Sequence, residues 1–185
     1  IAYPCNLQHP DDITTFTHDI VLAHPDLNIL INNAGIQLNY DFLRESNIHD
    51  HIQREIQVNL TSTLQLSSSF LPHLTQQPQA AIVNVSSGLG LAPKKSAPVY
   101  CATKAAIHLF TKGLRYQLEA TNVKVFEIIP PLVSTPMTEG RGKGKMSPDQ
   151  LVDEFIRGFE RDRYEIRIGK VKLLSLIQRI SPGLA

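Results

Sequence analysis

The sequence contains no tryptophan and only two cysteines, Cys5 and Cys101, among its 185 residues. Two cysteines cannot build a disulfide scaffold, and no Cys-x-x-Cys pair indicates a zinc site. His49 and His51 flank Asp50, but no further ligand at a suitable spacing completes a metal site, and a solvated helix face explains them. We therefore expect no metal, and we expect a cytoplasmic location, where cysteines stay reduced.

An excess of charge of either sign is also absent, since 18 Lys and Arg residues stand against 17 Asp and Glu residues. The resulting net charge of +1 argues against a nucleic-acid partner and against a membrane surface. No apolar run approaches the roughly 18 residues that cross a bilayer, and the opening residues do not resemble a signal peptide. A hydrophobic content of 42% instead indicates one globular domain over residues 1–185.

Short β-rich runs alternate with longer amphipathic stretches along the chain. The predicted strands are 27–35, 81–88, 123–131 and 165–169, and the opening IAYPC has the pattern of the tail of another strand. The predicted helices span about 11–23, 41–71, 98–119 and 147–160, the last one opened by a start signal at Ser147. This alternation predicts an α/β fold with a parallel sheet covered by helices on both faces. Functional residues of such folds lie just beyond the carboxyl ends of the strands.

Polar motifs occupy these positions: NNAG at 32–35, Asn59, SSG at 86–88 and YCATK at 100–104. Tyr100 and Lys104 are four residues apart, so on a helix they share one face. A phenol has an ordinary pKa of about 10, and a neighbouring ammonium favours the phenolate. The pair is therefore a means of making tyrosine exchange protons near neutral pH. The spacing alone also arises by chance on exposed helix faces, so the other motifs are needed to support this interpretation.

Taken together, NNAG, VNL, NVSSG, YCATK and IIPPLVST resemble the short-chain dehydrogenase/reductase family of NAD(P)-dependent enzymes. The resemblance covers essentially the whole chain in the right order and spacing, and it implies a doubly wound Rossmann-type fold. The PPLVST and RISPGLA segments are most similar to the oxidoreductases associated with teichoic-acid D-alanylation.

The resemblance implies catalytic roles for Asn59, Ser87, Tyr100 and Lys104. Tyr100 would exchange the proton of a carbonyl or alcohol substrate while a hydride moves at the nicotinamide, and Lys104 would lower the pKa of Tyr100 and bind the nicotinamide ribose. Ser87 would position the substrate oxygen, and Asn59 would hold a water that links Lys104 to solvent. A homodimer or homotetramer would form through the helices that carry Asn59 and Tyr100.

The same resemblance implies a set of residues that bind NAD or NADP: Asn6, Asn33, Ala34, Gly35, Tyr100, Lys104, Pro130, Val133 and Thr135. Two departures from the family pattern stand out. Asn6 occupies a place where the family commonly has Asp, and Pro130-Pro131 replaces the usual Pro-Gly. Because proline cannot take a positive φ and has no N–H, the loop there must run differently.

The stretch EGRGKGK, residues 139–145, is rich in glycine and in basic residues. A mobile, solvated loop is the simplest interpretation, while a phosphate-binding or RNA-contacting role lacks both the GxxxxGK[ST] spacing and stacking aromatic residues. The resemblance places a substrate lid over residues 138–160, for which glycines provide hinge freedom.

The family also opens with a strand, a glycine-rich loop and a helix that bind the pyrophosphate, and nothing in this sequence matches them. The run LNILI is then expected to be an uncovered apolar edge. Three alternatives remain open: the sequence is part of a longer protein, it is a fragment produced by design or proteolysis, or it is a truncated, catalytically idle module that acts through protein–protein interaction. The choice between NAD and NADP cannot be made from these residues.

Two further residues near the motif receive structural interpretations. Cys101 follows Tyr100 in sequence, but successive helical residues point about 100° apart, which favours a packing role. His108 would lie two turns from the Tyr100 chemistry.

Overall fold

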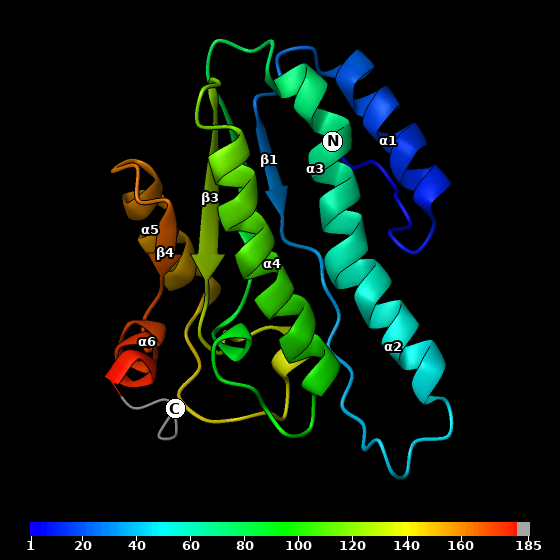
Figure 1. The fold of residues 1–185 in the computed structure, drawn as a ribbon, viewed down its shortest axis with the longest axis vertical. Coiled ribbons are helices and arrows are strands. Elements are labelled where there is room, and N and C mark those ends of the chain that lie inside the picture. Colours follow the sequence, from blue (N-terminus) through cyan, green and yellow to red (C-terminus); the bar gives the residue numbers. More distant parts are fainter. Residues whose placement is uncertain (181–185) are drawn as a thin grey trace.

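The computed structural model describes residues 1–180, which form a four-stranded parallel sheet in the order β1-β2-β3-β4 (Figure 1). The strands are β1 (Ile29–Asn32), β2 (Ala80–Val85), β3 (Val123–Ile129) and β4 (Glu165–Arg167). The helices are α1 (Pro10–Ala23), α2 (Ile48–Ile56), α3 (Ser62–Leu74), α4 (Pro98–Gln117), α5 (Pro148–Phe159) and α6 (Val171–Ile180). This arrangement confirms the predicted Rossmann-type α/β fold. The end of the RISPGLA segment lies outside the described residues.

Each face of the sheet has its own apolar core, because successive strand residues point to opposite faces. On one face Ile82 and Val125 pack with residues of α1, α3 and α4, among them Phe70 and Leu114. On the other face Val83, Phe126 and Ile128 pack with side chains of α5, including Phe155 and Phe159. Helices on both faces leave β2 and β3 almost wholly buried, as expected for parallel strands.

The second predicted helix, 41–71, is corrected by the structure. It begins at Ile48, because residues 41–47 form turns in which the Asp41 side chain accepts a hydrogen bond from the amide of Leu43. Its middle is a five-residue π-helix, Gln57–Thr61, and the helical path then continues as α3 to Leu74. The other three predicted helices agree with α1, α4 and α5 to within two residues, whereas β1 is shorter than the predicted run 27–35 and α6 was not predicted. Ser147 caps α5 by accepting a hydrogen bond from the amide of Gln150.

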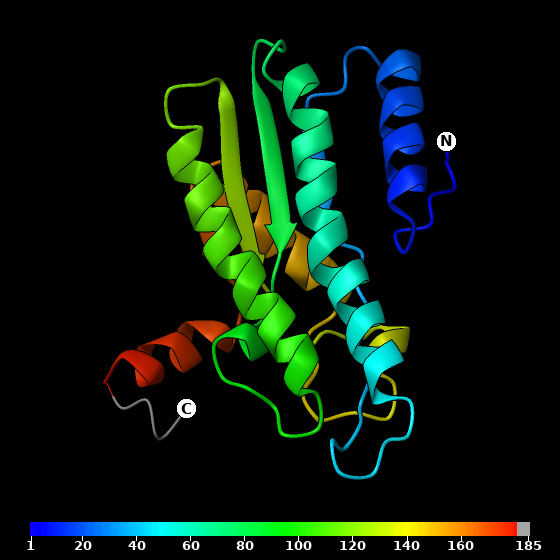
Figure 2. The ribbon, with the colours of Figure 1, turned by 45° about the vertical axis from the view of Figure 1, so that its right-hand side comes forward.

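The edge of the sheet at β1 is uncovered, as the sequence predicted. Ile29 and Ile31 are 43% and 50% exposed, and β1 pairs only with β2. The prediction that IAYPC ends a strand is wrong, because no described strand lies beside it to supply backbone partners. Helix α1 instead packs against α3 through Phe16 and Phe70, and Figure 2 shows it to the side of the sheet. None of the described helices is long and apolar enough to span a membrane.

Candidate functional site

The predicted catalytic residues gather where β1 and β2 end and α4 begins. Ser87 follows β2 by two residues, and the NNAG segment follows directly from the end of β1. Tyr100 and Lys104 lie in the first two turns of α4. Because the strands are parallel, their carboxyl ends bring segments far apart in the sequence to one edge of the sheet.

Lys104 is the buried cation of this site. Its side chain is 5% exposed, and its Nζ donates a hydrogen bond of 2.7 Å to the carbonyl oxygen of Val85, the last residue of β2. The same nitrogen lies 5.8 Å from the centroid of the Tyr100 ring. Burial disfavours the ammonium and lowers the pKa of Lys104 to about 8. The side chain can therefore exchange a proton near physiological pH.

Tyr100 departs from the predicted electrostatics. Burial raises its pKa, while the nearby Ser87 hydroxyl and the charge of Arg141 act to lower it. The sequence predicted that Lys104 would lower the pKa of Tyr100, but Lys104 is not among the groups that do so here. The physical reason is that burial lowers the pKa of Lys104 to about 8, so Lys104 has lost its charge before a phenol with a raised pKa titrates.

Ser87 is held against α4 by a tight loop. Its Oγ accepts a hydrogen bond of 3.1 Å from the amide of Leu89 and caps a short 3-10 helix, Gly88–Gly90. A Cβ on Gly90 would lie only 2.8 Å from the Lys104 carbonyl carbon, so the loop can approach α4 this closely only because residue 90 has no side chain. This contact fixes the position of Ser87 along the axis of α4, relative to Tyr100 and Lys104.

Asn59 lies in the π-helix and holds the loop after β1. It is 1% exposed, its Oδ1 accepts from the amide of Ile36 at 2.8 Å, and its Nδ2 donates to the carbonyl of Ile36 at 2.8 Å. A Cβ on Gly35 would lie 3.2 Å from Asn59 Oδ1 and 3.7 Å from Lys104 Nζ. The structure thus joins NNAG, Asn59 and Lys104. The periodicity of the sequence did not predict the π-helix that positions Asn59.

Most of the predicted cofactor-binding residues border this edge. Asn33 and Ala34 are exposed after β1. The carbonyl of Pro130 accepts a hydrogen bond from the amide of Gly88, next to Ser87. Further along the same segment, Val133 forms an isolated parallel bridge with Met146, and the amide of Thr135 donates to the hydroxyl of Thr138.

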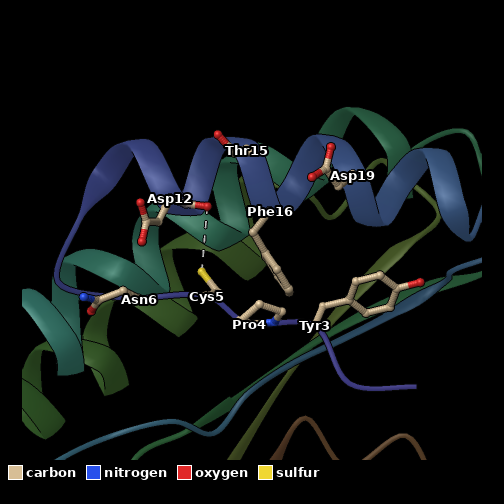
Figure 3. A pocket seen from close by; sticks show the side chains of 8 residues that line it. All are labelled: Tyr3, Pro4, Cys5, Asn6, Asp12, Thr15, Phe16 and Asp19. Carbon is tan, nitrogen blue, oxygen red and sulfur yellow. Dashed lines mark hydrogen bonds between the residues drawn. The ribbon is translucent and has the colours of Figure 1, made fainter.

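Asn6 lies in a different place. Its side chain accepts a hydrogen bond from the amide of Gln8, and it lines an open pocket between the N-terminal segment and α1 (Figure 3). The eight lining residues are Tyr3, Pro4, Cys5, Asn6, Asp12, Thr15, Phe16 and Asp19. None of them is a predicted catalytic residue, so this pocket is separate from the Tyr100 site.

Two fully buried carboxylates near the site were missed from the sequence. Glu127 of β3 accepts a hydrogen bond of 2.5 Å from Ser86 and lies 2.8 Å from Nδ1 of His108 on α4. Glu55 of α2 accepts from the amide of Leu38 and from the hydroxyl of Tyr40, both at 2.9 Å. A lone Glu inside the apolar run VFEII was a signal of a buried, hydrogen-bonded carboxylate, whereas its partner His108 was not evident.

Among the described residues, no group of three or more His, Cys, Asp or Glu side chains could hold a metal ion. Cys101 is buried, in agreement with its predicted packing role, and its sulfur accepts a hydrogen bond from the amide of Lys94.

Comparison with known proteins identifies relatives for this arrangement. Residues 1–145 match the family model for short chain dehydrogenases. The chain is 41% identical over 155 residues to the uncharacterized oxidoreductase DltE of Bacillus subtilis (strain 168), with 80% of this chain and 62% of that protein covered. The match is consistent with the predicted subgroup. The chain therefore spans less than two thirds of the length of this relative.

Solved structures share the fold. A short chain dehydrogenase from Burkholderia cenocepacia J2315 in complex with NADP gives a TM-score of 0.87 at 23% identity, covering 97% of this chain and 76% of that one. A short chain dehydrogenase/reductase from Burkholderia phymatum in complex with NAD gives a TM-score of 0.86 at 18% identity, covering 100% of this chain and 76% of that one. The family match and the match to DltE do not favour the alternative of a catalytically idle interaction module.

Proposed function

The chain belongs to the short-chain dehydrogenase family, and on that basis we propose that the protein is an NAD(P)-dependent oxidoreductase acting on small carbonyl or alcohol substrates. One observation carries the proposal. Tyr100, Lys104 and Ser87 meet at the carboxyl end of β2, where Lys104 is bonded to the strand and the Ser87 hydroxyl lies near enough to Tyr100 to act on its pKa. A half-buried phenol, a hydroxyl and an ammonium at one point form a site for moving a proton to or from a substrate oxygen.

The reaction divides between the cofactor and the side chains. The bound nicotinamide supplies or accepts the hydride. Tyr100 gives its phenolic proton to the carbonyl oxygen in reduction and takes it back in oxidation. The Ser87 oxygen already accepts a bond from Leu89, which leaves its own hydrogen to donate to the same substrate oxygen.

Lys104 returns the proton to Tyr100 in this proposal. Its ammonium has three donors, of which one bonds Val85, so two remain for the nicotinamide ribose and a water held near Asn59. A pKa of about 8 lets Lys104 pass protons close to neutral pH.

The surrounding residues fit the nicotinamide half of the cofactor. Gly35 leaves open the space beside Asn59 and Lys104 that a Cβ would crowd. Asn33 and Ala34 would line the adenosine side, and Pro130, Val133 and Thr135 would border the nicotinamide. Asn6 would reach the adenine of the cofactor. Both cofactors are candidates, since the two Burkholderia structures hold NADP in one case and NAD in the other.

Assembly and location complete the proposal. Leu109 on α4 is 69% exposed, which supports packing of this helix against a second copy in a homodimer or homotetramer. Residues 138–160 would form the substrate lid of the single domain, and the protein would act in the cytoplasm.

The direct test is carbonyl reduction by the full-length protein. Ketones and aldehydes of varied size and charge are offered with NADH and with NADPH, and the alcohol is measured by mass spectrometry against the cofactor consumed. The proposal predicts one alcohol formed for each cofactor oxidised. Absence of product with both cofactors across the whole panel would count against it.

A further inference from the structure

The loop after Thr138 returns to the segment that follows β1. Arg141 donates a hydrogen bond of 2.6 Å from Nη1 to Oε1 of Gln37, across 104 positions of sequence. Gln37 lies between Ile36, which Asn59 holds at both its amide and its carbonyl, and Leu38, whose amide bonds Glu55. The guanidinium is thereby placed beside the loop that carries Gly35 to the catalytic site.

The loop itself is built to present this side chain. Gly140, Gly142 and Gly144 all have positive φ, at 70°, 61° and 67°, which side-chain-bearing residues rarely adopt. The amide of Arg141 donates to the carbonyl of Thr138 at 3.0 Å, and Lys145 also bonds that carbonyl. Alternating glycines thus reverse the chain around Arg141.

The base of the loop is tied to the segment that follows β3. The amide of Met146 donates to the carbonyl of Leu132 at 2.9 Å, and the amide of Ser134 donates to the carbonyl of Met146 at 2.8 Å. The position of Arg141 therefore depends on the same segment that contains the predicted cofactor residues Val133 and Thr135.

The side-chain N–H groups of Arg141 and Gln37 have no anionic acceptor among residues 1–180. Arg141 is half-buried, and no carboxylate within residues 1–180 comes within 4.0 Å of its guanidinium nitrogens. Nε2 of Gln37 is buried and has no hydrogen-bond partner in the same part of the chain. A guanidinium with four N–H groups left, next to an unpartnered amide N–H₂, is a donor set suited to an anion.

Resting on the proposed function, we propose that Arg141 and Gln37 bind a carboxylate of the substrate, so that the enzyme selects oxo acids, or the matching hydroxy acids, over neutral ketones and alcohols. Arginine binds carboxylates with two parallel hydrogen bonds, which orients the ligand as well as attracting it. The charge of Arg141 reaches the catalytic residue, because it acts to lower the pKa of Tyr100. A carboxylate held at Arg141 leaves the far end of a short substrate to meet Tyr100 and Ser87.

The experiment compares short oxo acids with their methyl esters, using the full-length protein and either cofactor. Wild-type protein is expected to give kcat/KM about 10- to 100-fold higher for the acids, the range that a charged hydrogen-bonding contact supplies. Arg141→Gln is expected to lower kcat/KM for the acids far more than for the esters, so that the preference is lost. Lys143→Gln is the matched control, since Lys143 lies on the same loop, is exposed and makes no hydrogen bond or ion pair within residues 1–180.

Two kinetic outcomes would overturn the inference and leave the proposed function intact. In one, acids and esters react equally well in wild-type protein and in Arg141→Gln. In the other, Arg141→Gln raises the KM for NAD(P)H and lowers kcat/KM for acids and esters alike, which assigns Arg141 to a cofactor phosphate.

A calorimetric arm separates failure of this inference from failure of the proposed function. Succinate, an unreactive dicarboxylate, is titrated into wild-type protein and into Arg141→Gln, and the heat of binding is measured. Succinamide serves as the neutral probe. Succinate binding that is lost in Arg141→Gln supports the anion site even without turnover. An equal affinity of wild-type protein for succinate and succinamide, or no binding of either, would overturn it.

Discussion

The ammonium nitrogen of Lys104 lies 2.7 Å from the carbonyl oxygen of Val85. Val85 ends β2 and is followed by Ser86 and Ser87, so this one hydrogen bond ties the helix that carries Tyr100 to the strand end that carries Ser87. The relative placement of the phenol and the hydroxyl therefore depends on a buried cation.

Burying that cation predicts a specific pH dependence of stability. The pKa of Lys104 falls from 10.5 to about 8 on folding, so between these values the unfolded chain binds more protons than the folded one. The free energy of unfolding consequently rises with pH from 8 to about 10.5, and the penalty of burying the ammonium is fully present below pH 8. Lys104→Met removes this contribution.

The free energy of unfolding of wild-type protein relative to Lys104→Met is expected to increase by about 3 kcal/mol between pH 7 and pH 10.5. Denaturant unfolding of both proteins at several pH values measures it. Tyr100 is present in both and cancels in the difference. A difference that stays constant with pH would show that Lys104 titrates as an exposed lysine does.

The pair formed by Glu127 and His108 predicts a stability loss. Glu127→Ala leaves Ser86 and His108 without their buried acceptor, and removal of one partner of a buried pair costs roughly 3 kcal/mol or more. Asp162→Asn is the control, because Asp162 forms an exposed ion pair with Lys124 and its loss is expected to be undetectable. Equal midpoints of denaturant unfolding for the two variants would contradict the account.

The Ser87 loop approaches α4 closely at Gly90, whereas Gly113 on α4 faces open space. Substitution by alanine is therefore expected to change the stability of the protein in opposite directions at these two positions. Gly90→Ala places a Cβ 2.8 Å from the backbone of Lys104, so it is expected to cost about 1–3 kcal/mol and to lower turnover. Gly113→Ala, on the open side of the same helix, meets nothing within 4 Å and is expected to stabilise by roughly 0.5–1 kcal/mol. Thermal unfolding of both variants tests the pair, and a neutral Gly90→Ala would show that the loop is not constrained.

The sequence predicted those features that depend on local patterns. Apolar runs located β2 and β3, and the Ser147 signal located the start of α5. Motif order placed Ser87, Tyr100 and Lys104 at one edge of the sheet, where the structure brings them together. Local turn bonding at Asp41 was the cause of the misplaced start of the second helix.

Features that depend on contacts between distant segments were not predictable. The π-helix that carries Asn59 leaves no periodic signature, and the contact of Arg141 with Gln37 spans 104 positions. The pKa of Tyr100 was predicted from its helical neighbour alone. Burial instead raises the pKa of Tyr100, and Ser87 and Arg141 only oppose that rise. Burial is a property of the folded chain and cannot be read from a helical neighbour.

The most direct test of the account measures cofactor affinity and single-turnover hydride transfer in the full-length protein and in Tyr100→Phe, with Tyr116→Phe as control because Tyr116 is exposed on the same helix. Loss of the phenolic proton is expected to slow transfer by about 100-fold or more while the affinity for NAD(P)H is retained, and Tyr116→Phe is expected to behave as wild type. A Tyr100→Phe protein that reduces the substrate at the wild-type rate would contradict the assignment of Tyr100 as the acid–base catalyst.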